Sequence, residues 1–133
     1  MLKLLDFFFI TFHTLLVFFN LFGWIHRKTR LLNLITLSLT GSSWFLLGIF
    51  YGMGYCPLTD WHFRVLTKLG EKDLPASYIE YMAERFFPWD VSSKTVDLLT
   101  VVLYFSALIM AVTLVCRDYI KARKIVEDNC ASR

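Results

Sequence analysis

The sequence has few cysteines and few prolines, with three of each among 133 residues. The cysteines, Cys56, Cys116 and Cys130, are far apart along the chain. A small secreted domain that relies on disulfide bonds has a denser and more regular set of cysteines. The sequence therefore argues against a disulfide-stabilised extracellular fold.

Catalytic and phosphate-binding signatures are also missing. We find no GxSxG nucleophile elbow, no HExxH zinc motif and no glycine-rich loop ending in Lys-Ser or Lys-Thr. No groove-reading motif accompanies the basic residues, which flank apolar stretches, so we expect no nucleic-acid partner. No feature of the sequence indicates catalysis, and we expect a protein without catalytic activity or cofactor.

Apolar residues are abundant and concentrated. Hydrophobic residues make up 56% of the chain, against about 45–50% in soluble domains. They gather in the three stretches 7–25, 31–55 and 96–116. Each is close to the ~20 residues that a helix needs to cross a bilayer. The sequence predicts one all-α membrane domain over residues 1–133, with transmembrane helices at about 5–25, 31–55 and 94–117. The first stretch is too long for a signal peptide and lacks a cleavage site, so we expect it to be retained.

Lysine and arginine predict the orientation, because basic loops stay on the cytoplasmic side. With three crossings, the turn after the first helix and the tail share one side, which has a net charge of +5. The other side has a net charge of −2. We therefore expect an outer amino terminus and a cytoplasmic tail over residues 118–133. On this topology Cys56 has no cysteine on its own side with which to pair.

The segment between the second and third crossings, about 58–88, is predicted to form short amphipathic helices in the outer interface. Pro57 ends the preceding helix, and Thr59 can cap the next one. Leu58, Trp61, Val65 and Leu69 recur at helical spacing, so we expect them to form the apolar side of that helix in the interface. A second short helix would end at Pro88, with Ile79, Met82 and Phe86 on its apolar side and Glu80, Glu84 and Arg85 exposed. Aromatic residues would form an interfacial belt: Tyr51, Tyr55, Trp61, Tyr78, Tyr81 and Trp89.

Glycines in the second stretch predict how the helices pack. Gly48 and Gly52 form a GxxxG match, and Gly41 lies seven residues before Gly48. Small residues allow two membrane helices to approach closely. We interpret the three glycines as the packing seam of the bundle, with homodimerisation as the alternative. Asn20 and Asn33 are interpreted as interhelical hydrogen-bonding residues.

Four residues are candidates for ligand binding: His13, Cys56, His62 and Glu80. His13 is expected at membrane depth, where ionisable groups are costly and often functional. It could ligate haem or pass protons, or it could be neutral and bonded to a hydroxyl such as that of Ser42, Ser43 or Ser106. Cys56, His62 and Glu80 form an incomplete ligand set for zinc, which usually has three or four protein ligands. The alternative is that Cys56 packs as an apolar group and His62 faces lipid headgroups, so no metal is predicted.

Two short motifs carry a family resemblance. Cys56-Pro57-Leu58-Thr59 follows the second apolar stretch, and Tyr78-Ile79-Glu80-Tyr81 precedes the third. With these motifs in these places, the chain resembles the domain of unknown function 2784 family of small bacterial membrane proteins. It departs from the family pattern at His62, where many members carry glutamate, and at Tyr81, where many carry histidine. The resemblance implies an envelope membrane location and no established function.

Two functional hypotheses follow from the sequence. The first is a non-enzymatic accessory or scaffold protein of the bacterial inner membrane, which contacts the lipid bilayer and another membrane protein or a second copy of itself. The alternative is a membrane protein that holds haem, a metal or a lipophilic molecule through His13, Cys56, His62 and Glu80.

Overall fold

The computed structural model describes residues 1–52, 54–75, 77–86 and 92–131, and every regular element in these ranges is a helix. Three helices are long and apolar enough to cross a membrane. The first is α1, Leu2–Phe22. The second is a continuous helix made of α2, Arg30–Ser42, the π-helical turn η1, Ser43–Leu47, and α3, Gly48–Tyr51. The third is α6, Ser93–Ala131. The all-α prediction is confirmed.

The second crossing ends earlier than the predicted residue 55. Gly52 has a φ of 104°, a conformation that a residue with a side chain rarely adopts, and the helix ends at Tyr51. Gly52 is exposed and has open space around it, whereas Gly41 and Gly48 are buried. The glycine stripe therefore packs at its first two positions, and Gly52 serves as a helix terminator.

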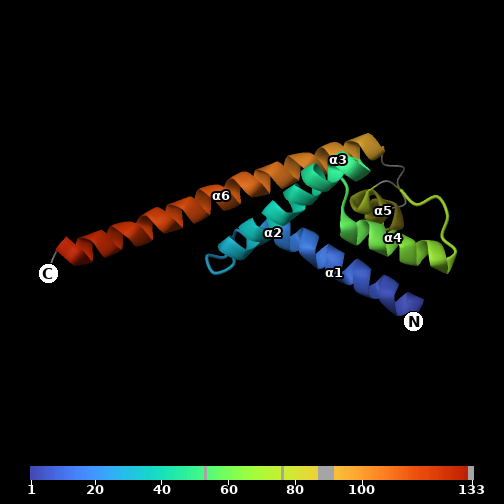
Figure 1. Ribbon diagram of the computed structural model, residues 1–133, viewed down its shortest axis with the longest axis horizontal. Helices are drawn as coiled ribbons and strands as arrows, with labels where there is room; N and C mark the ends of the chain where they lie inside the picture. The colour runs from blue at the N-terminus through green and yellow to red at the C-terminus, as the bar shows by residue number, and fades with distance from the viewer. Residues whose placement is uncertain (53, 76, 87–91, 132–133) are drawn as a thin grey trace.

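The third crossing is longer than predicted, because α6 continues through the expected tail to Ala131. At 1.5 Å per residue a helix of 39 residues is about 58 Å long, roughly twice the ~30 Å of a hydrocarbon core. In Figure 1 its carboxyl-terminal half extends beyond the other helices. Arg30 and Arg27 at the turn after α1 contact Asp118, at 2.8 and 3.5 Å, which holds the turn against α6.

The segment between the second and third crossings forms α4, Pro57–Leu69, and α5, Tyr78–Phe86. Both lie in the space between α1 and the start of α6 (Figure 1). The predicted end of α5 at Pro88 and the predicted belt residue Trp89 lie outside the described residues.

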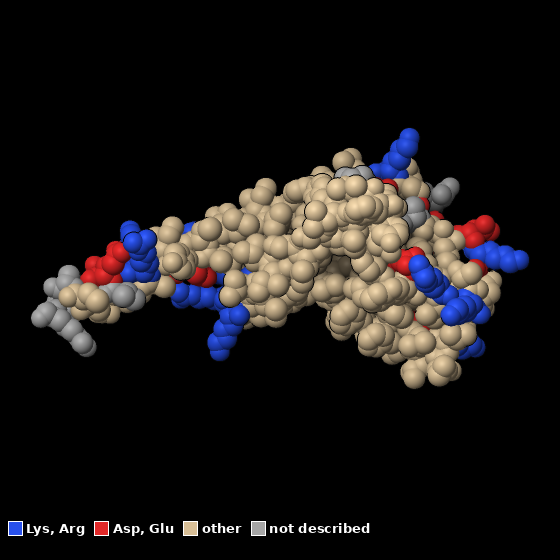
Figure 2. All heavy atoms as spheres, viewed as in Figure 1, with Lys and Arg blue, Asp and Glu red and all other residues tan. Residues whose placement is uncertain are grey.

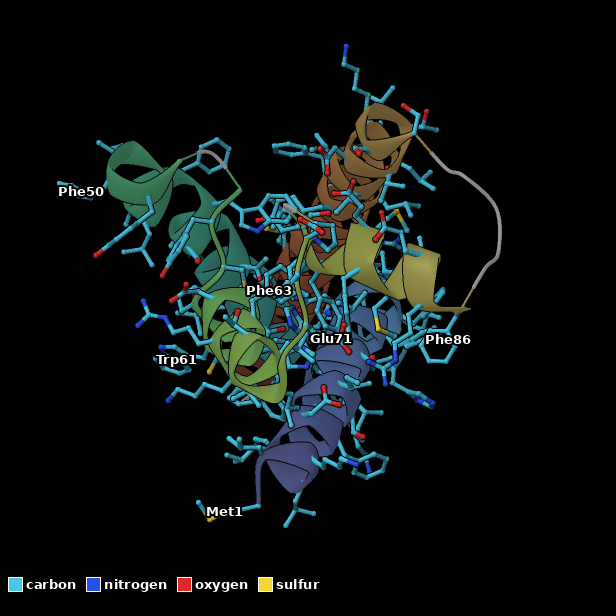
Figure 3. The ribbon with its side chains drawn as sticks, turned by 90° about the vertical axis from the view of Figure 1, so that its right-hand side faces the viewer. Met1, Phe50, Trp61, Phe63, Glu71 and Phe86 are labelled. Atoms are coloured by element: carbon cyan, nitrogen blue, oxygen red, sulfur yellow. The ribbon has the colours of Figure 1, made fainter. Side chains whose placement is uncertain are left out.

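The buried face of α4 differs from its predicted apolar side. Thr59, His62 and Leu66 are buried, and Trp61 is 55% exposed. Figure 3 shows Trp61 pointing away from the bundle while Phe63 points into it. The side of α4 that faces the protein is therefore not its apolar stripe, because α4 packs along α1, which offers Asp6 as a partner for His62. Of the stripe, Leu69 packs against the core between α4 and α5, and Trp61 is exposed. Burying His62 against that carboxylate satisfies a polar group that lipid could not satisfy.

Two cores hold the helices together. Between α2 and α6, Leu37, Tyr104, Ala107 and Ala111 are buried in contact with one another. The Tyr104 hydroxyl donates a hydrogen bond to the Leu37 carbonyl and lies where a side chain on Gly41 would be. Between α4 and α5, Leu66, Tyr78 and Tyr81 form the second core.

Outside these cores the long helices expose large apolar side chains. Leu4 and Phe7 on α1, Leu39 on α2 and Ile109 on α6 are each 64% to 71% exposed. Charged side chains gather at the two ends of the molecule and leave an uncharged zone between them (Figure 2). A soluble monomer rarely exposes so much contiguous apolar surface. These faces are suited to contact with lipid.

Candidate functional site

His62 and Asp6 form a buried polar pair. His62 is completely buried, and its Nε2 lies 2.7 Å from Asp6 Oδ1, so that the ring N–H donates to the carboxylate. Helix α4 supplies the histidine, and the first turns of α1 supply the carboxylate. Phe9 stacks on the imidazole, with ring centroids 5.7 Å apart. The prediction that His62 faces lipid headgroups is therefore wrong.

His13 lies about two helical turns after Asp6 on α1 and is also buried, with 7% of its surface exposed. Its ring stacks on Tyr78, with a centroid distance of 3.8 Å and an interplanar angle of 13°. The ring of His62 lies beside the same tyrosine, with the two ring centroids 6.1 Å apart. The two histidines thus share one aromatic neighbour, which the sequence did not predict. None of the three predicted hydroxyls is bonded to His13 among the described residues. Ser43 donates to the Tyr55 carbonyl, Ser106 donates to the Val102 carbonyl, and Ser42 is exposed.

Tyr78 connects α5 to α1. Its hydroxyl donates to the Ile10 carbonyl at 3.0 Å. A phenol has one proton to donate, so Thr14 must supply the proton of the second bond, also 3.0 Å long. Burial raises the pKa of the Tyr78 phenol, and the hydrogen bond with Thr14 opposes part of that shift. Tyr78 therefore stays protonated and holds α5 against the middle of α1.

Glu80 and Tyr81 are buried as well, although the sequence predicted an exposed Glu80 and an interfacial Tyr81. Ser93 donates a hydrogen bond to Glu80 Oε1, which links α5 to the first residue of α6. Tyr81 packs edge-on against His62 and accepts a hydrogen bond from Arg85. Burial raises the pKa of Tyr81, against the opposing effect of Arg85. We call Asp6, His13, His62, Tyr78 and Tyr81 the histidine cluster.

The four predicted ligand residues do not form one site. His13 and His62 meet in the histidine cluster, Glu80 bonds to Ser93, and Cys56 lies at the amino-terminal end of α4 with a partly exposed thiol. Within the described ranges no group of three or more histidine, cysteine or acidic residues is placed to hold a metal ion.

A cavity of about 610 Å³ lies where the two cores meet. Helices α1, α2, α4, α5 and α6 all contribute to its wall, and Trp44 of the π-helical turn projects onto it. In Figure 2 the surface is hollowed in the middle of the molecule, between the α2–α3 side and the α4 side. His13 and Cys56 are part of the wall, so the cavity brings together two of the four predicted residues.

Hydrogen bonds between α1 and α2 lie at the part of the cavity wall that Asn20 and Thr40 form. Asn20 donates to Thr40 Oγ1 at 3.1 Å and accepts from Thr36 at 2.8 Å. Asn33 donates to the carbonyls of Phe19 and Asn20, at 2.7 and 3.2 Å. The predicted role of both asparagines as interhelical hydrogen-bonding residues is confirmed.

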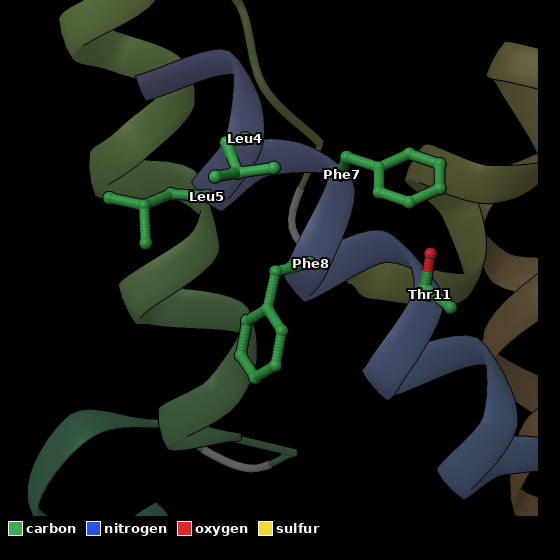
Figure 4. A pocket seen from close by; sticks show the side chains of 5 residues that line it. All are labelled: Leu4, Leu5, Phe7, Phe8 and Thr11. Atoms are coloured by element: carbon green, nitrogen blue, oxygen red, sulfur yellow. The ribbon is translucent and has the colours of Figure 1, made fainter. Parts of the chain in front are cut away.

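A second hollow, of about 590 Å³, differs from this cavity because a single helix lines it (Figure 4). Its wall consists of five α1 residues: Leu4, Leu5, Phe7, Phe8 and Thr11. None of the candidate residues reaches it. We interpret it as a groove between side chains on the lipid-facing surface.

Sequence reasoning missed Asp6, Tyr78 and Tyr104. Asp6 had a detectable signal, because it directly precedes three phenylalanines at the start of an apolar stretch. An acidic residue at such a place in a membrane helix is costly unless it has a partner. Tyr78 and Tyr104 had none, since tyrosine is common in interfacial belts. Only the packing of α5 on α1, and of α6 on α2, shows that their hydroxyls bond to buried carbonyls.

Comparisons with known proteins give a family and no function. No curated protein matches the chain, and no solved structure matches it. The family model described as Protein of Unknown function (DUF2784) matches residues 3–116, which include α1, the second crossing, α4, α5 and the apolar part of α6. The chain therefore belongs to the DUF2784 family.

Proposed function

We propose that this protein binds a lipophilic molecule within the membrane, in the cavity between its five helices, and that it does so without catalysis. The observation that carries the proposal is the cavity itself, about 610 Å³ in volume. Ligand sites are typically concave spaces of about 300–1,000 Å³ with mostly apolar walls and a few polar groups. Leu37, Leu103 and Ala107 supply apolar wall, whereas His13 and Thr59 supply polar groups.

The position of the cavity supports a ligand that arrives from the bilayer. Its wall includes residues from all three helices that are long enough to cross a membrane. The surfaces beside it on these helices are apolar and exposed. A water-soluble ligand would have to cross this apolar zone, whereas a lipid already occupies it.

The accessory or scaffold function has weaker support. It relied on the segment between the second and third crossings to contact a partner, and two aromatic residues of that segment, Tyr78 and Tyr81, are buried inside the molecule. Haem held by two histidines has weaker support too, because His62 Nε2 is engaged by Asp6. We retain, as part of the proposal, a location in the bacterial cytoplasmic membrane with the amino terminus outside.

The test measures which lipids co-purify with the native protein and with a variant whose cavity is filled by a larger side chain. Leu103 lines the cavity and is 42% exposed, so Leu103→Trp can fill the space without entering a sealed core. Leu98, on the same helix, is 65% exposed and is not part of the wall, so Leu98→Trp is the matched control. Each protein is extracted in mild detergent, and bound lipids are quantified by mass spectrometry. We expect one lipophilic compound to be retained at near-stoichiometric amounts by the native protein and Leu98→Trp, and to be lost from Leu103→Trp. Equal lipid content in all three would overturn the proposal.

A further inference from the structure

The charges around the cavity restrict the ligand that it can hold. Among the residues that the structure describes, neither lysine nor arginine belongs to the wall, and Asp60 is the one carboxylate. The Asp60 carboxylate lies 3.0 Å from Arg64 Nε and is neutralised by it. An anionic headgroup would find no cation in the wall, and a cationic one would compete with Arg64. These charges favour a neutral ligand.

Two buried polar side chains of the wall have no partner. His13 is 7% exposed and Thr59 is 8% exposed. In the described part of the chain, neither the His13 ring nor the Thr59 hydroxyl makes a hydrogen bond. His13 Nδ1 is completely buried, whereas His13 Nε2 and the Thr59 hydroxyl keep some accessible surface and are the atoms that a ligand could reach. Buried polar groups in native proteins nearly always have a partner, because an unsatisfied group loses its bond to water without compensation. The wall therefore has unused hydrogen-bonding capacity at two places.

These two groups lie on neighbouring elements. His13 belongs to α1 and Thr59 to α4, and the two helices pack against each other. A neutral imidazole offers one donor and one acceptor, and a threonine hydroxyl can do both. Three other buried atoms have no partner among the described residues, and they belong to residues that are not part of the cavity wall: Asn33 Oδ1, His62 Nδ1 and Glu80 Oε2.

From these observations we propose that the ligand is a neutral lipid with a carbonyl or hydroxyl group, which His13 and Thr59 bind by hydrogen bonds. This inference rests on the proposed function, because it names the chemical class that the cavity accepts. The apolar part of the ligand would lie against Leu37, Leu103 and Ala107, and a ring or unsaturated chain would suit Trp44 and Phe63.

The test compares three lipids that share one branched twenty-carbon skeleton and differ in their polar group, together with an isoprenoid quinone. The full-length protein in detergent micelles is mixed with phytane, phytol or phytanic acid, and with ubiquinone-2 as the carbonyl-bearing isoprenoid. Native mass spectrometry measures the fraction bound at each concentration. We expect phytol or ubiquinone-2 to bind about ten-fold more tightly than phytane, since each hydrogen bond typically contributes a few-fold in affinity. Phytanic acid should bind more weakly than phytol. The ratio of phytol to ubiquinone-2 shows whether a hydroxyl or a carbonyl is preferred.

The matched variants are Thr59→Val and Thr67→Val. Both remove a threonine hydroxyl from α4, but Thr67 is exposed, bonds to the Phe63 carbonyl and is not part of the wall. We expect Thr59→Val to weaken phytol binding about five-fold and to leave phytane binding unchanged, with no effect of Thr67→Val. Thr59→Ser keeps the hydroxyl and should restore binding, which separates hydrogen bonding from a general effect on folding. His13→Phe should reduce phytol binding in the same way.

The outcomes separate this inference from the proposed function. Equal binding of phytane and phytol, with no effect of Thr59→Val, would overturn the hydrogen-bonding inference and leave a purely apolar site. Tighter binding of phytanic acid would overturn the argument from charge. If the native protein binds every probe no more tightly than the Leu103→Trp variant does, the proposed function itself is overturned.

Discussion

At the scale of single residues, the most consequential feature is the burial of His62 against Asp6. A completely buried imidazole is unfavourable in an apolar surrounding unless its N–H has an acceptor. The carboxylate 2.7 Å away supplies one. The two residues are 56 positions apart, so the pair ties the amino-terminal end of α1 to α4. Phe9 and Tyr81 pack against the imidazole, and neither Asp6 nor His62 belongs to the cavity wall.

We expect Asp6→Ala to destabilise the protein. It leaves His62 buried without an acceptor, which typically costs about 1–3 kcal/mol in the free energy of unfolding. The double variant Asp6→Ala/His62→Phe removes both polar groups and should recover part of the loss. Thermal unfolding in detergent, followed by circular dichroism, measures both effects.

The exposed Glu84 provides the control for that experiment, because Glu84→Ala removes a carboxylate from a surface position. It should change the free energy of unfolding by less than about 0.5 kcal/mol. If Asp6→Ala unfolds at the same temperature as Glu84→Ala, the buried pair does not contribute to stability and α4 is held by its apolar contacts alone.

At the scale of elements, the packing of α2 against α6 depends on small residues from both helices. Gly41 comes from α2, and Ala107 and Ala111 come from α6. Small residues bring two backbones close enough for the Tyr104 hydroxyl to reach the Leu37 carbonyl at 2.9 Å. The sequence pointed to the glycine but not to the two alanines, since alanine is unremarkable in an apolar stretch.

We expect Gly41→Ala to weaken this contact, because the added Cβ overlaps the Tyr104 hydroxyl. Overpacking of this kind typically costs about 1–3 kcal/mol. Tyr104→Phe removes the overlapping oxygen, so the double variant Gly41→Ala/Tyr104→Phe should be more stable than Gly41→Ala alone. Ser38→Ala, at an exposed position of the same helix, is the control. Thermal unfolding midpoints that fall equally for the single and double variants would contradict the assigned contact.

The α4–α5 segment shows why an amphipathic pattern can indicate a helix and still mislead about its buried face. Both helices formed near the expected places, with Pro57 at the start of α4 and Gly70 after its end. The periodicity predicted an exposed Glu80 and put Thr59 and His62 outside the apolar stripe, whereas all three residues are buried. Apolar periodicity identifies the buried face of a helix that has water on its other side. Helices α4 and α5 instead pack against protein surfaces that contain carboxylates and hydroxyls, so their polar residues can be the buried ones.

At the scale of the whole molecule, the helices separate a basic end from an end that contains α4 and α5. The turn after α1 and the residues around Asp118 meet at the basic end, where Arg27 and Arg30 contact that carboxylate. Asp6 and His62 meet at the other end. This arrangement agrees with three successive crossings, because such a chain brings these segments to opposite sides.

We expect the two ends to differ in accessibility in a bacterial cell. In single-cysteine variants expressed in a bacterial host, a cysteine at Lys72, which is exposed between α4 and α5, should react with a membrane-impermeant maleimide in intact spheroplasts. Native Cys130, near the end of α6, should react only after permeabilisation. The physical reason is the concentration of basic residues at the end that contains Cys130. The reverse labelling pattern would contradict the proposed orientation.

The sequence by itself determined that this chain forms three long apolar helices with short polar helices between the second and third. The reason is local: a stretch of about twenty uncharged residues has to leave water and to satisfy its backbone internally, and a helix does both. Length and composition are enough for that conclusion, and they also identified His13 and Cys56 as residues worth attention.

Only the tertiary structure decided which polar residues meet. His62 is bonded to Asp6, His13 stacks on Tyr78, and Thr59 lies on the wall of a cavity, where its hydroxyl makes no hydrogen bond to any described residue. These contacts join residues that lie far apart in the sequence, and they depend on how α4 and α5 are rotated in the space between α1 and α6. Helical periodicity gives the spacing of side chains along one helix, but the partner that each side chain finds depends on the helix packed against it.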